Sequence, residues 1–327
     1  MARAIQTTVD EFKPDIVHVH NTSPLISNAI FRAIGSRAKK ALTLHNYRTV
    51  CPAGIPMRDG KICTLCIDRR SSWPALQYGC YRNSRLATLP LGLSVGLHRW
   101  LKTWQRDVAA IIVLSDFQKE MMLKAGFPEQ RIFVKGNFCV ESPNSPMGVK
   151  EDNCIFVGRL SSEKGVRTLI EAWKLWGHDA PLLKIIGDGC LRYDLEKAAR
   201  NLNIVFLGQC ETEKTHREIA KGKLLILPSE CFETFGMVVV EAYAHATPVA
   251  VSDLGSLPSI VQAGVTGVIF PPAHPEQLYE VVSRLWRDQP TLSDMGVNAR
   301  RAFEEKYTEA ANYTRLNEIY AQLQKGG

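Results

Sequence analysis

The sequence predicts an α/β protein of two lobes, each built around a parallel β-sheet, and three observations support this prediction. Short apolar runs rich in β-branched residues alternate with helical patterns along the 327 residues, which is typical of βαβ units. Most of these runs are apolar throughout, as expected of strands buried on both faces of a sheet. The segment 138–152, with two prolines, one glycine and few apolar residues, predicts a linker between the lobes.

Ten strands are predicted, four before the linker and six after it. They are 15–20, 41–45, 109–114, 131–135, 153–157, 182–187, 204–207, 224–227, 248–252 and 267–270. Apolar residues recurring every three or four positions predict helices over 116–125, 165–176 and 191–202. The predicted domains are 1–140, with a cysteine-containing insertion at about 48–85, and 141–307. A last helix over 308–327 could pack back on the first domain.

Bulk composition is that of a globular protein, with 45% apolar and 22% charged residues. The N-terminal residues lack the apolar core of a signal peptide, and no run approaches the roughly 18 apolar residues that a membrane span needs. Nine cysteines without an export signal favour reduced thiols or metal ligation over disulfides. We therefore expect a cytoplasmic location.

Positive charge is concentrated in one part of the chain. The net charge is +7, and ten Arg and Lys between Arg48 and Arg106 face only two acids, Asp59 and Asp68. Such a region favours an anionic partner, such as a phosphate-bearing acceptor, an acidic membrane surface or nucleic acid. A solvated basic face is the alternative.

The first motif of the second lobe follows the predicted strand 153–157. Gly158 and Arg159 begin a turn that ends with Lys164 and Gly165, directly before a helix. Ligands bind at such carboxyl-edge turns of parallel sheets, and the two cations can converge on a pyrophosphate. An ordinary turn with two surface cations is equally compatible with the pattern.

Two weaker glycine-containing strand ends are predicted to line the same edge. Gly187 ends the strand 182–187 and Asp188 follows it, and Gly208 follows the strand 204–207. Glycines at strand ends are common, so each signal alone is weak.

The most specific motif runs from Pro228 to Ala242. It leads from a strand through a loop that contains Glu233 into a helix that contains Glu241. The free N–H groups and the dipole of the new helix favour an anion. Because Glu241 lies in an otherwise apolar stretch, its carboxylate needs a partner, and sugar and ribose hydroxyls could provide one.

The Glu233-x7-Glu241 pair, the Pro-Ser that opens this segment and the Gly-Arg-Leu-x3-Lys-Gly turn resemble glycosyltransferase family 4, a retaining family with the GT-B fold of two facing Rossmann-like domains. The resemblance covers nearly the whole chain from Asp15 and is most specific between Gly158 and Pro258. It implies transfer of a sugar from a nucleotide-sugar donor to a glycan or lipid-linked acceptor. It also implies that no metal cofactor is required, because cations and helix dipoles stabilise the leaving group.

The resemblance also assigns roles to residues of the second lobe. Arg159 and Lys164 would bind the pyrophosphate, Glu241 the ribose hydroxyls, and Glu233 the transferred sugar. The remaining donor contacts would come from the backbone amides of Phe235, Gly236 and Met237 and from the turn at Gly208 near the base.

The first lobe places polar residues at two predicted strand ends. His45, followed by Asn46 and Arg48, occupies the position at which related enzymes have a catalytic histidine, and His20 could lie beside it. We expect His45, with Glu233 of the second lobe, to be catalytic, and His20, Asn46 and Arg48 to lie on the acceptor side. His18 sits inside its strand and is predicted to be structural, and Ser115 is expected to cap a helix.

Only fourteen residues precede the strand that begins at Asp15, whereas the family has further βα units there. The resemblance therefore implies an incomplete first domain with an exposed sheet edge. Such an edge favours a homodimer or pairing with a separately encoded segment. A nucleotide-sugar-binding subunit with impaired turnover is accordingly the alternative to an active enzyme.

Four cysteines, Cys51, Cys63, Cys66 and Cys80, have a spacing that fits a four-thiolate zinc site holding an irregular loop. Free thiols and disulfides are the alternatives, because only one CxxC is present. The apolar helix predicted over 86–104 has Arg and Lys at both ends, so the region 82–106 could contact an anionic membrane. A core-packed helix with solvated ends is the alternative. Nucleic-acid binding is disfavoured, since few aromatic residues interleave with the basic ones.

Overall fold

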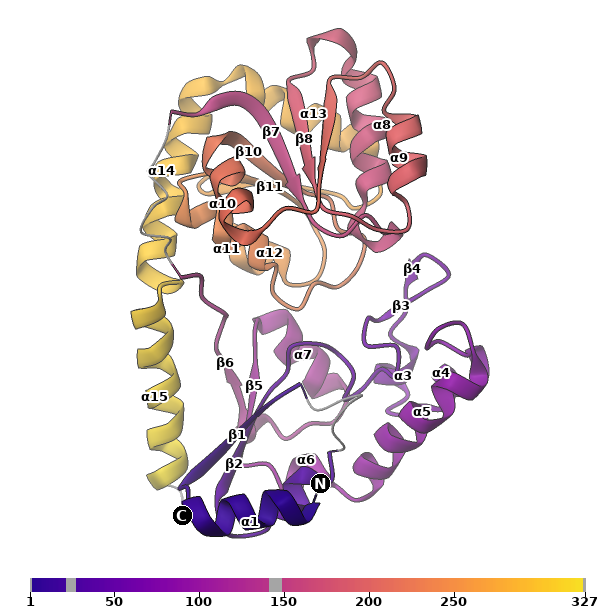
Figure 1. Ribbon diagram of the computed structural model, residues 1–327, viewed down its shortest axis with the longest axis vertical. Coiled ribbons are helices and arrows are strands. Elements are labelled where there is room, and N and C mark those ends of the chain that lie inside the picture. Colours follow the sequence, from indigo (N-terminus) through magenta and orange to yellow (C-terminus); the bar gives the residue numbers. More distant parts are fainter. Residues whose placement is uncertain (1, 22–27, 141–148, 326–327) are drawn as a thin grey trace. The chain divides into compact units, whose positions relative to one another are not determined.

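A computed structural model describes residues 2–21, 28–140 and 149–325. The chain forms two compact units (Figure 1), unit 1 comprising Met1–Gly136 with Tyr313–Gly327, and unit 2 comprising Asn137–Asn312. The ten predicted strands are all present within one or two residues of their predicted bounds, and the α/β class is confirmed. Most of the predicted linker, 141–148, lies outside the described residues.

Unit 1 contains a four-stranded parallel sheet in the order β1-β2-β5-β6. The strands are β1 Ile16–His20, β2 Lys39–Thr43, β5 Ala110–Val113 and β6 Ile132–Val134. Its helices outside the insertion are α1 Ala2–Phe12, α2 Ile30–Ile34, α7 Asp116–Lys124 and the C-terminal part of α15 Glu309–Lys325, with a short 3₁₀ turn, η1 Glu129–Arg131. Ile319 and Leu323 of α15 are buried against Ala41, Ala110 and Ile112, so this helix covers one face of the sheet.

An insertion of small elements separates β2 from β5. It consists of β3 Met57–Arg58, β4 Lys61–Ile62, α3 Leu65–Asp68, α4 Trp73–Tyr78, α5 Arg85–Trp100 and α6 Thr103–Arg106. The β3–β4 hairpin turns at Asp59 and Gly60, which both have positive φ, as a two-residue Asp-Gly hairpin turn requires. The prediction of a single helix over 86–104 is wrong. The segment forms two helices, α5 and α6, because Lys102 between them adopts a left-handed conformation.

Unit 2 contains a six-stranded parallel sheet in the order β12-β11-β10-β7-β8-β9. The strands are β7 Glu151–Val157, β8 Leu182–Ile186, β9 Ile204–Gly208, β10 Gly222–Leu227, β11 Val249–Ser252 and β12 Gly267–Phe270. The chain leaves β7 toward β8 and β9 and then returns to the other side of β7 at β10. This reversal between β7 and β10 is a topological switch point, where doubly wound sheets bind ligands.

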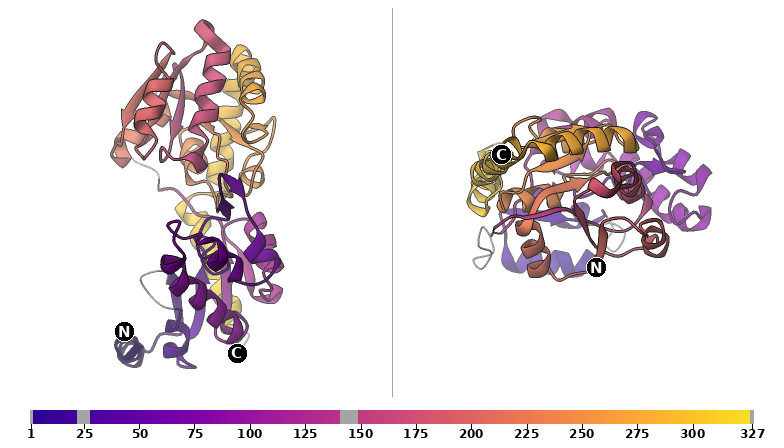
Figure 2. Two further views of the ribbon diagram at one scale, coloured as in Figure 1. Left: turned by 90° about the vertical axis from the view of Figure 1, so that its right-hand side faces the viewer. Right: turned by 90° about the horizontal axis from the view of Figure 1, so that it is seen from above.

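Helices cover both faces of the unit 2 sheet (Figure 2). They are α8 Val166–Trp176, α9 Arg192–Ala198, α10 Thr212–Lys221, α11 Met237–Ala244, α12 Leu257–Ile260, α13 Pro275–Arg287 and α14 Gln289–Lys306, with the 3₁₀ turns η2 Ser162–Lys164 and η3 Gly177–Asp179. Helices α8 and α13 pack together on one face, and α11 packs on α14 on the other. The apolar strands therefore lie in a continuous core, and polar side chains gather at the strand ends.

Candidate active site

The switch point of unit 2 brings together the two most specific predicted motifs. The Nζ atom of Lys164, in the turn after β7, lies 2.6 Å from Oε1 of Glu233, in the loop after β10. Ser229 donates a hydrogen bond of 2.7 Å to the same oxygen, and the Ser256 hydroxyl donates to the Glu233 carbonyl. The Glu233 carboxylate is thus fixed by a cation and a hydroxyl from different segments.

The ion pair between Lys164 and Glu233 is largely shielded from solvent, with 25% and 15% of the two side chains exposed. Burial lowers the pKa of Lys164 and the Glu233 carboxylate raises it, with a net increase, so the lysine stays charged. Removing one partner would leave the other charge buried, which costs more than the loss of an exposed pair.

Gly165 explains how the two loops approach each other so closely. Its φ is +65°, and a Cβ there would lie 1.8 Å from the carbonyl oxygen of Pro228. The backbone of Glu230 also donates to the carbonyl of Glu163 at 2.9 Å. The glycine of the Gly-Arg-Leu-x3-Lys-Gly turn is therefore required by the packing of one loop on the other.

The N-terminus of α11 opens beside Glu233. Gly236 caps it in a left-handed conformation with φ of +90°, and no side chain caps the helix. Within the described residues, the backbone N–H groups of Phe235, Gly236 and Met237 have no protein acceptor. The structure thus leaves three N–H groups and the positive end of a helix dipole at the switch point, which is the arrangement that binds phosphate.

Glu241 lies one turn into α11 and has no hydrogen-bond or ion-pair partner in the described part of the chain. Burial raises the pKa of its carboxyl group. Arg159, by contrast, has 71% of its side chain exposed and contacts only Glu163, at 4.0 Å. A partly buried carboxylate and a solvent-exposed guanidinium are both therefore available to a ligand.

The other predicted strand ends join the same edge through their backbone. Gly187 donates to the carbonyl of Gly208, and Leu160 donates to the carbonyl of Asp188, each at 2.9 Å. The Asp188 carboxylate accepts from the Gly189 amide and from Arg192, and these two bonds lower its pKa. Asp188 is therefore engaged within its own turn.

In unit 1, the carboxyl ends of β1 and β2 bring His20 and His45 together. His20 Nδ1 lies 2.8 Å from His45 Nε2. Burial lowers the pKa of both rings, and His45 is lowered further by His20 and then Lys135. Both histidines are thus biased to the neutral form at pH 7, in which one ring nitrogen can accept a proton. Lys135 was not among the predicted site residues, although it follows β6 at the same edge of the sheet as His20 and His45.

His18 is held within unit 1. Its two ring nitrogens lie 2.7 Å from the Tyr320 hydroxyl of α15 and from Thr43 Oγ1. Burial lowers its pKa to about 4, followed by the effects of His20, Lys135 and His45. The geometry agrees with a structural histidine that ties the last helix to the sheet.

The remaining acceptor-side residues form a local network. Asn46 donates to Asn21 Oδ1 and accepts from the Arg48 amide. The Arg48 guanidinium donates to the carbonyl of Pro52 and lies over the ring of Tyr81. Arg48 thus anchors the start of the insertion.

Ser115 caps α7, as predicted, by accepting a hydrogen bond from the Gln118 amide. The Gln118 side chain accepts from the Leu114 amide and donates to the Leu44 carbonyl. This buried link fixes the end of β2 directly before His45.

The four cysteines of the insertion are free thiols in the structure, and Cys51 and Cys66 are buried. Burial raises the pKa of Cys51 to about 12 and of Cys66 to about 11, and electrostatic repulsion from neighbouring cysteines raises both pKa values further. Among residues 2–21, 28–140 and 149–325, no three histidine, cysteine or acidic side chains are arranged as metal ligands. The zinc site stays a prediction.

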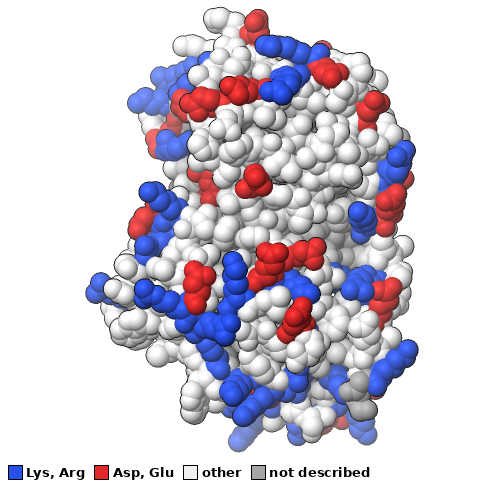
Figure 3. All heavy atoms as spheres, turned by 180° about the vertical axis from the view of Figure 1, so that it is seen from behind, with Lys and Arg blue, Asp and Glu red and all other residues white. Residues whose placement is uncertain are grey.

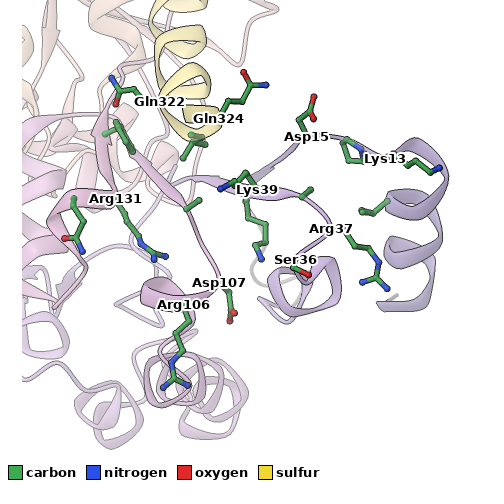
Figure 4. A pocket seen from close by; sticks show the side chains of 18 of the residues that line it. Lys13, Asp15, Ser36, Arg37, Lys39, Arg106, Asp107, Arg131, Gln322 and Gln324 are labelled. Carbon is green, nitrogen blue, oxygen red and sulfur yellow. The ribbon is translucent and has the colours of Figure 1, made fainter. Parts of the chain in front are cut away.

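A broad groove lies at the opposite, amino-terminal edge of the unit 1 sheet (Figure 4). It has a volume of about 1270 Å³ and is lined by Lys13, Lys39 and Arg106 among other residues. Arg37, which also lines it, is paired with Asp10 at 2.6 Å. The predicted site residues of unit 1, His20, His45, Asn46 and Arg48, do not line this groove.

Comparisons with known proteins agree with these features. The sequence profile described as glycosyl transferases group 1 matches residues 141–302, and that of glycosyltransferase family 4 matches residues 1–138. Sulfoquinovosyl transferase SQD2 of Arabidopsis thaliana is 26% identical over 97% of this chain and 58% of its own length. Alpha-D-kanosaminyltransferase of Streptomyces kanamyceticus is 29% identical over 67% of this chain and 61% of its own. The chain thus spans about three fifths of the length of these curated relatives.

Solved structures share the fold. Anabaena Alr3699/HepE in complex with UDP superposes with a TM-score of 0.71 at 16% identity, covering 98% of this chain and 81% of that one. Sucrose-phosphate synthase from Thermosynechococcus elongatus gives a TM-score of 0.71 at 16% identity, covering 100% of this chain and 78% of its own. From the two family profiles and the shared GT-B fold, the chain belongs to glycosyltransferase family 4, among the glycosyl transferases of group 1.

Proposed function

We propose that this chain is a retaining glycosyltransferase that moves a sugar from a nucleotide-sugar donor to a glycan or lipid-linked acceptor, of the kind used in cell-envelope or exopolysaccharide synthesis. The observation that carries the proposal is the switch point of unit 2. There a charged lysine, an uncapped helix N-terminus and an unpartnered carboxylate gather at one sheet edge.

Each part of this edge suits one part of a nucleotide sugar. The free amides at Phe235, Gly236 and Met237 would receive the diphosphate, together with Lys164 and Arg159. Glu241 would accept hydrogen bonds from ribose hydroxyls, which would give its buried carboxylate the partners it lacks in the protein. Glu233, held by Lys164 and Ser229, would orient the transferred sugar.

The same groups could stabilise the departing nucleoside diphosphate. Negative charge grows on the diphosphate oxygens as the glycosidic bond breaks, and fixed cations and helix N–H groups lower the energy of that charge without reorganising. We infer that no catalytic metal is required, since Lys164 and the N-terminus of α11 supply positive charge at this position. The leaving oxygen would then take the acceptor proton on the same face of the sugar, which preserves the anomeric configuration.

The names of relatives support transfer of a sugar and a nucleotide-containing donor. One relative is a sulfoquinovosyl transferase, another an O-antigen chain mannosyltransferase, and a structural neighbour was solved with UDP. In unit 1, we assign His45 to catalysis and His20, Asn46 and Arg48 to the acceptor side. A cytoplasmic location peripheral to the membrane, and a homodimer formed through the β1 edge, belong to the same proposal.

Two measurements separate an active transferase from a subunit that binds donor without turnover. The first is calorimetric binding of UDP-, GDP- and ADP-sugars to the chain, and the second is release of nucleoside diphosphate from the donor that binds. Binding with release supports the enzyme. Binding without release, in a chain extended upstream as well as in this one, would favour the binding subunit. Sedimentation velocity tests the dimer, which a monomer at micromolar concentration would contradict.

A further inference from the structure

Helix α5 turns its apolar side chains to solvent. Leu86 is 84% exposed, Leu93 58% and Trp100 78%, and Leu89 and Leu97 are also among the exposed large apolar residues. The side chains that α5 buries include the polar Thr88 and His98. This is the reverse of a surface helix on a globular protein, whose apolar stripe faces the core.

The exposed residues form one continuous stripe. Positions 86, 89, 93, 97 and 100 are spaced by three or four residues, so they follow one another along a single face of the helix. A helix of 16 residues is about 24 Å long. Seven of the seventeen exposed large apolar side chains among the described residues lie between 73 and 100, which marks a patch rather than scattered surface residues.

The neighbouring helix α4 lies against the other side of α5. A Cβ on Gly92 would lie 2.6 Å from the Leu76 side chain, and the Ser72 hydroxyl donates to the Gly92 carbonyl at 2.7 Å. The Ser72 hydroxyl also lies beside Gly96, in the second half of α5. The next residue, Trp73, begins α4 and is 66% exposed. The contacts of α4 with α5 are made at Gly92 and Gly96, and the five residues of the stripe remain exposed.

Positive charge surrounds this patch and negative charge is absent from its sequence. Between Asp68 and Asp107 the chain has seven Arg and Lys and no acidic residue. The exposed cations stand at both ends of α5: Arg82 lies before it, Arg85 is its first residue, and Lys102 and Arg106 follow it. Unit 1 as a whole has 22 Arg and Lys against 10 Asp and Glu, and basic side chains predominate on the face of unit 1 that Figure 3 shows.

We propose that α5 docks on an anionic lipid bilayer, lying in the plane of the interface with its leucine stripe at the acyl boundary and the flanking cations on the headgroups. No helix in the described part of the chain is long and apolar enough to span a membrane. A second copy of the chain fits this face less well, because a twofold contact would bring two strongly basic segments together. The docking does not depend on whether the donor site is active.

Vesicle flotation tests the proposal with a matched pair of variants. Leu93→Gln/Leu97→Gln removes two members of the stripe with a residue that favours helix. The control is Leu175→Gln on α8, because Leu175 and Leu97 are each 50% exposed. We expect the chain to float with vesicles of roughly one third phosphatidylglycerol and not with pure phosphatidylcholine. The double variant should bind the anionic vesicles at least about tenfold more weakly, and Leu175→Gln should bind like the wild type.

A second readout protects the test against misfolding of the double variant. Arg82→Gln/Arg85→Gln leaves the stripe intact, and it should weaken binding and make the remaining binding less dependent on salt. Brominated lipids should quench wild-type fluorescence, and Trp100→Phe should reduce the quenched fraction. The proposal is overturned if the folded wild-type chain does not bind anionic vesicles. It is equally overturned if the double variant, checked by circular dichroism, binds vesicles normally and instead loses self-association.

Discussion

Lys164 and Glu233, 69 residues apart in the chain, form a 2.6 Å ion pair across the loops that follow β7 and β10. These are the two strands between which the sheet order of unit 2 reverses. Because the pair sits beside the uncapped N-terminus of α11, it fixes a cation and a carboxylate where a diphosphate and its sugar would meet.

This pair predicts a large loss of activity when either partner is removed. Lys164→Met and Glu233→Gln should each lower kcat/KM for nucleoside diphosphate release by about a hundredfold or more. The first variant loses the cation that offsets charge on the leaving group, and the second loses the carboxylate that orients the sugar and holds Lys164 in place. Lys174→Met is the control, since Lys174 and Glu171 are also 2.6 Å apart but exposed. Release kinetics that do not distinguish Lys164→Met from Lys174→Met would remove the lysine from the site.

The close packing of the two loops gives a stability prediction. Gly165→Ala should lower the melting temperature of the chain, because its Cβ would overlap the Pro228 carbonyl. Gly60→Ala is the control, since Gly60 in the β3–β4 turn also has positive φ (+72°) but no atom within 4 Å of an added Cβ. Strain at φ alone costs about 1–2 kcal/mol, and the overlap should add about 1–3 kcal/mol. Equal melting temperatures of the two variants in differential scanning calorimetry would contradict the close approach of Gly165 to the Pro228 carbonyl.

His18 predicts a loss of stability on acidification. Its pKa is lowered to about 4 in the folded chain, below the usual value of about 6.5. The folded state therefore binds fewer protons than the unfolded state between these values, and stability present above pH 6.5 is lost as the pH falls toward 4. His245, whose pKa burial also lowers to about 4, contributes in the same direction. As the pH is lowered from 6.5 to 4, the melting temperature of His18→Gln should fall less steeply than that of the wild type. Parallel plots of melting temperature against pH would argue against a lowered pKa of His18.

The cysteine insertion predicts a zinc site. One side-chain nitrogen of Arg58 and two of Arg99 are buried without an acceptor in the described residues. Arg58 interacts electrostatically with Cys63, and Arg99 with Cys66. Four thiolates around Zn²⁺ would carry two net negative charges to offset these cations. Elemental analysis should find one zinc per chain, lost in Cys66→Ser and kept in Cys190→Ser. Absence of zinc, with nine thiols that react once the chain is denatured, would leave the free-thiol interpretation.

The strands and most of the helices follow from the sequence because apolar runs buried on both faces are unambiguous. The switch-point residues were also predictable, since a strand end, a glycine turn and a helix start place Lys164, Glu233 and Gly236 at one edge. The hairpin at Asp59 was not predicted. Its Asp-Gly pair is typical of a hairpin turn, but strands of two residues are too short to show a periodic pattern.

Long-range pairings were beyond the sequence. Nothing local indicates that Tyr320 would reach His18 across 302 residues, or that Gln118 would bond the carbonyl before His45. For α5 the sequence left two interpretations open, membrane contact and core packing, because an apolar helix has the same sequence pattern whether it faces a core or solvent. Packing decides these features, and packing depends on residues distant in the chain.

Calorimetric titration with UDP-, GDP- and ADP-sugars tests the central claim, that the switch point of unit 2 binds a nucleotide sugar, most directly. We expect the chain to bind one nucleotide class. Glu241→Gln should weaken this binding about tenfold or more, because a charged acceptor for hydroxyl groups is lost. Arg159→Ala should weaken it as well, and Glu213→Gln, an exposed position on α10, should not. Binding that is unchanged in Glu241→Gln and Arg159→Ala, or no binding of any donor by the folded chain, would contradict the account.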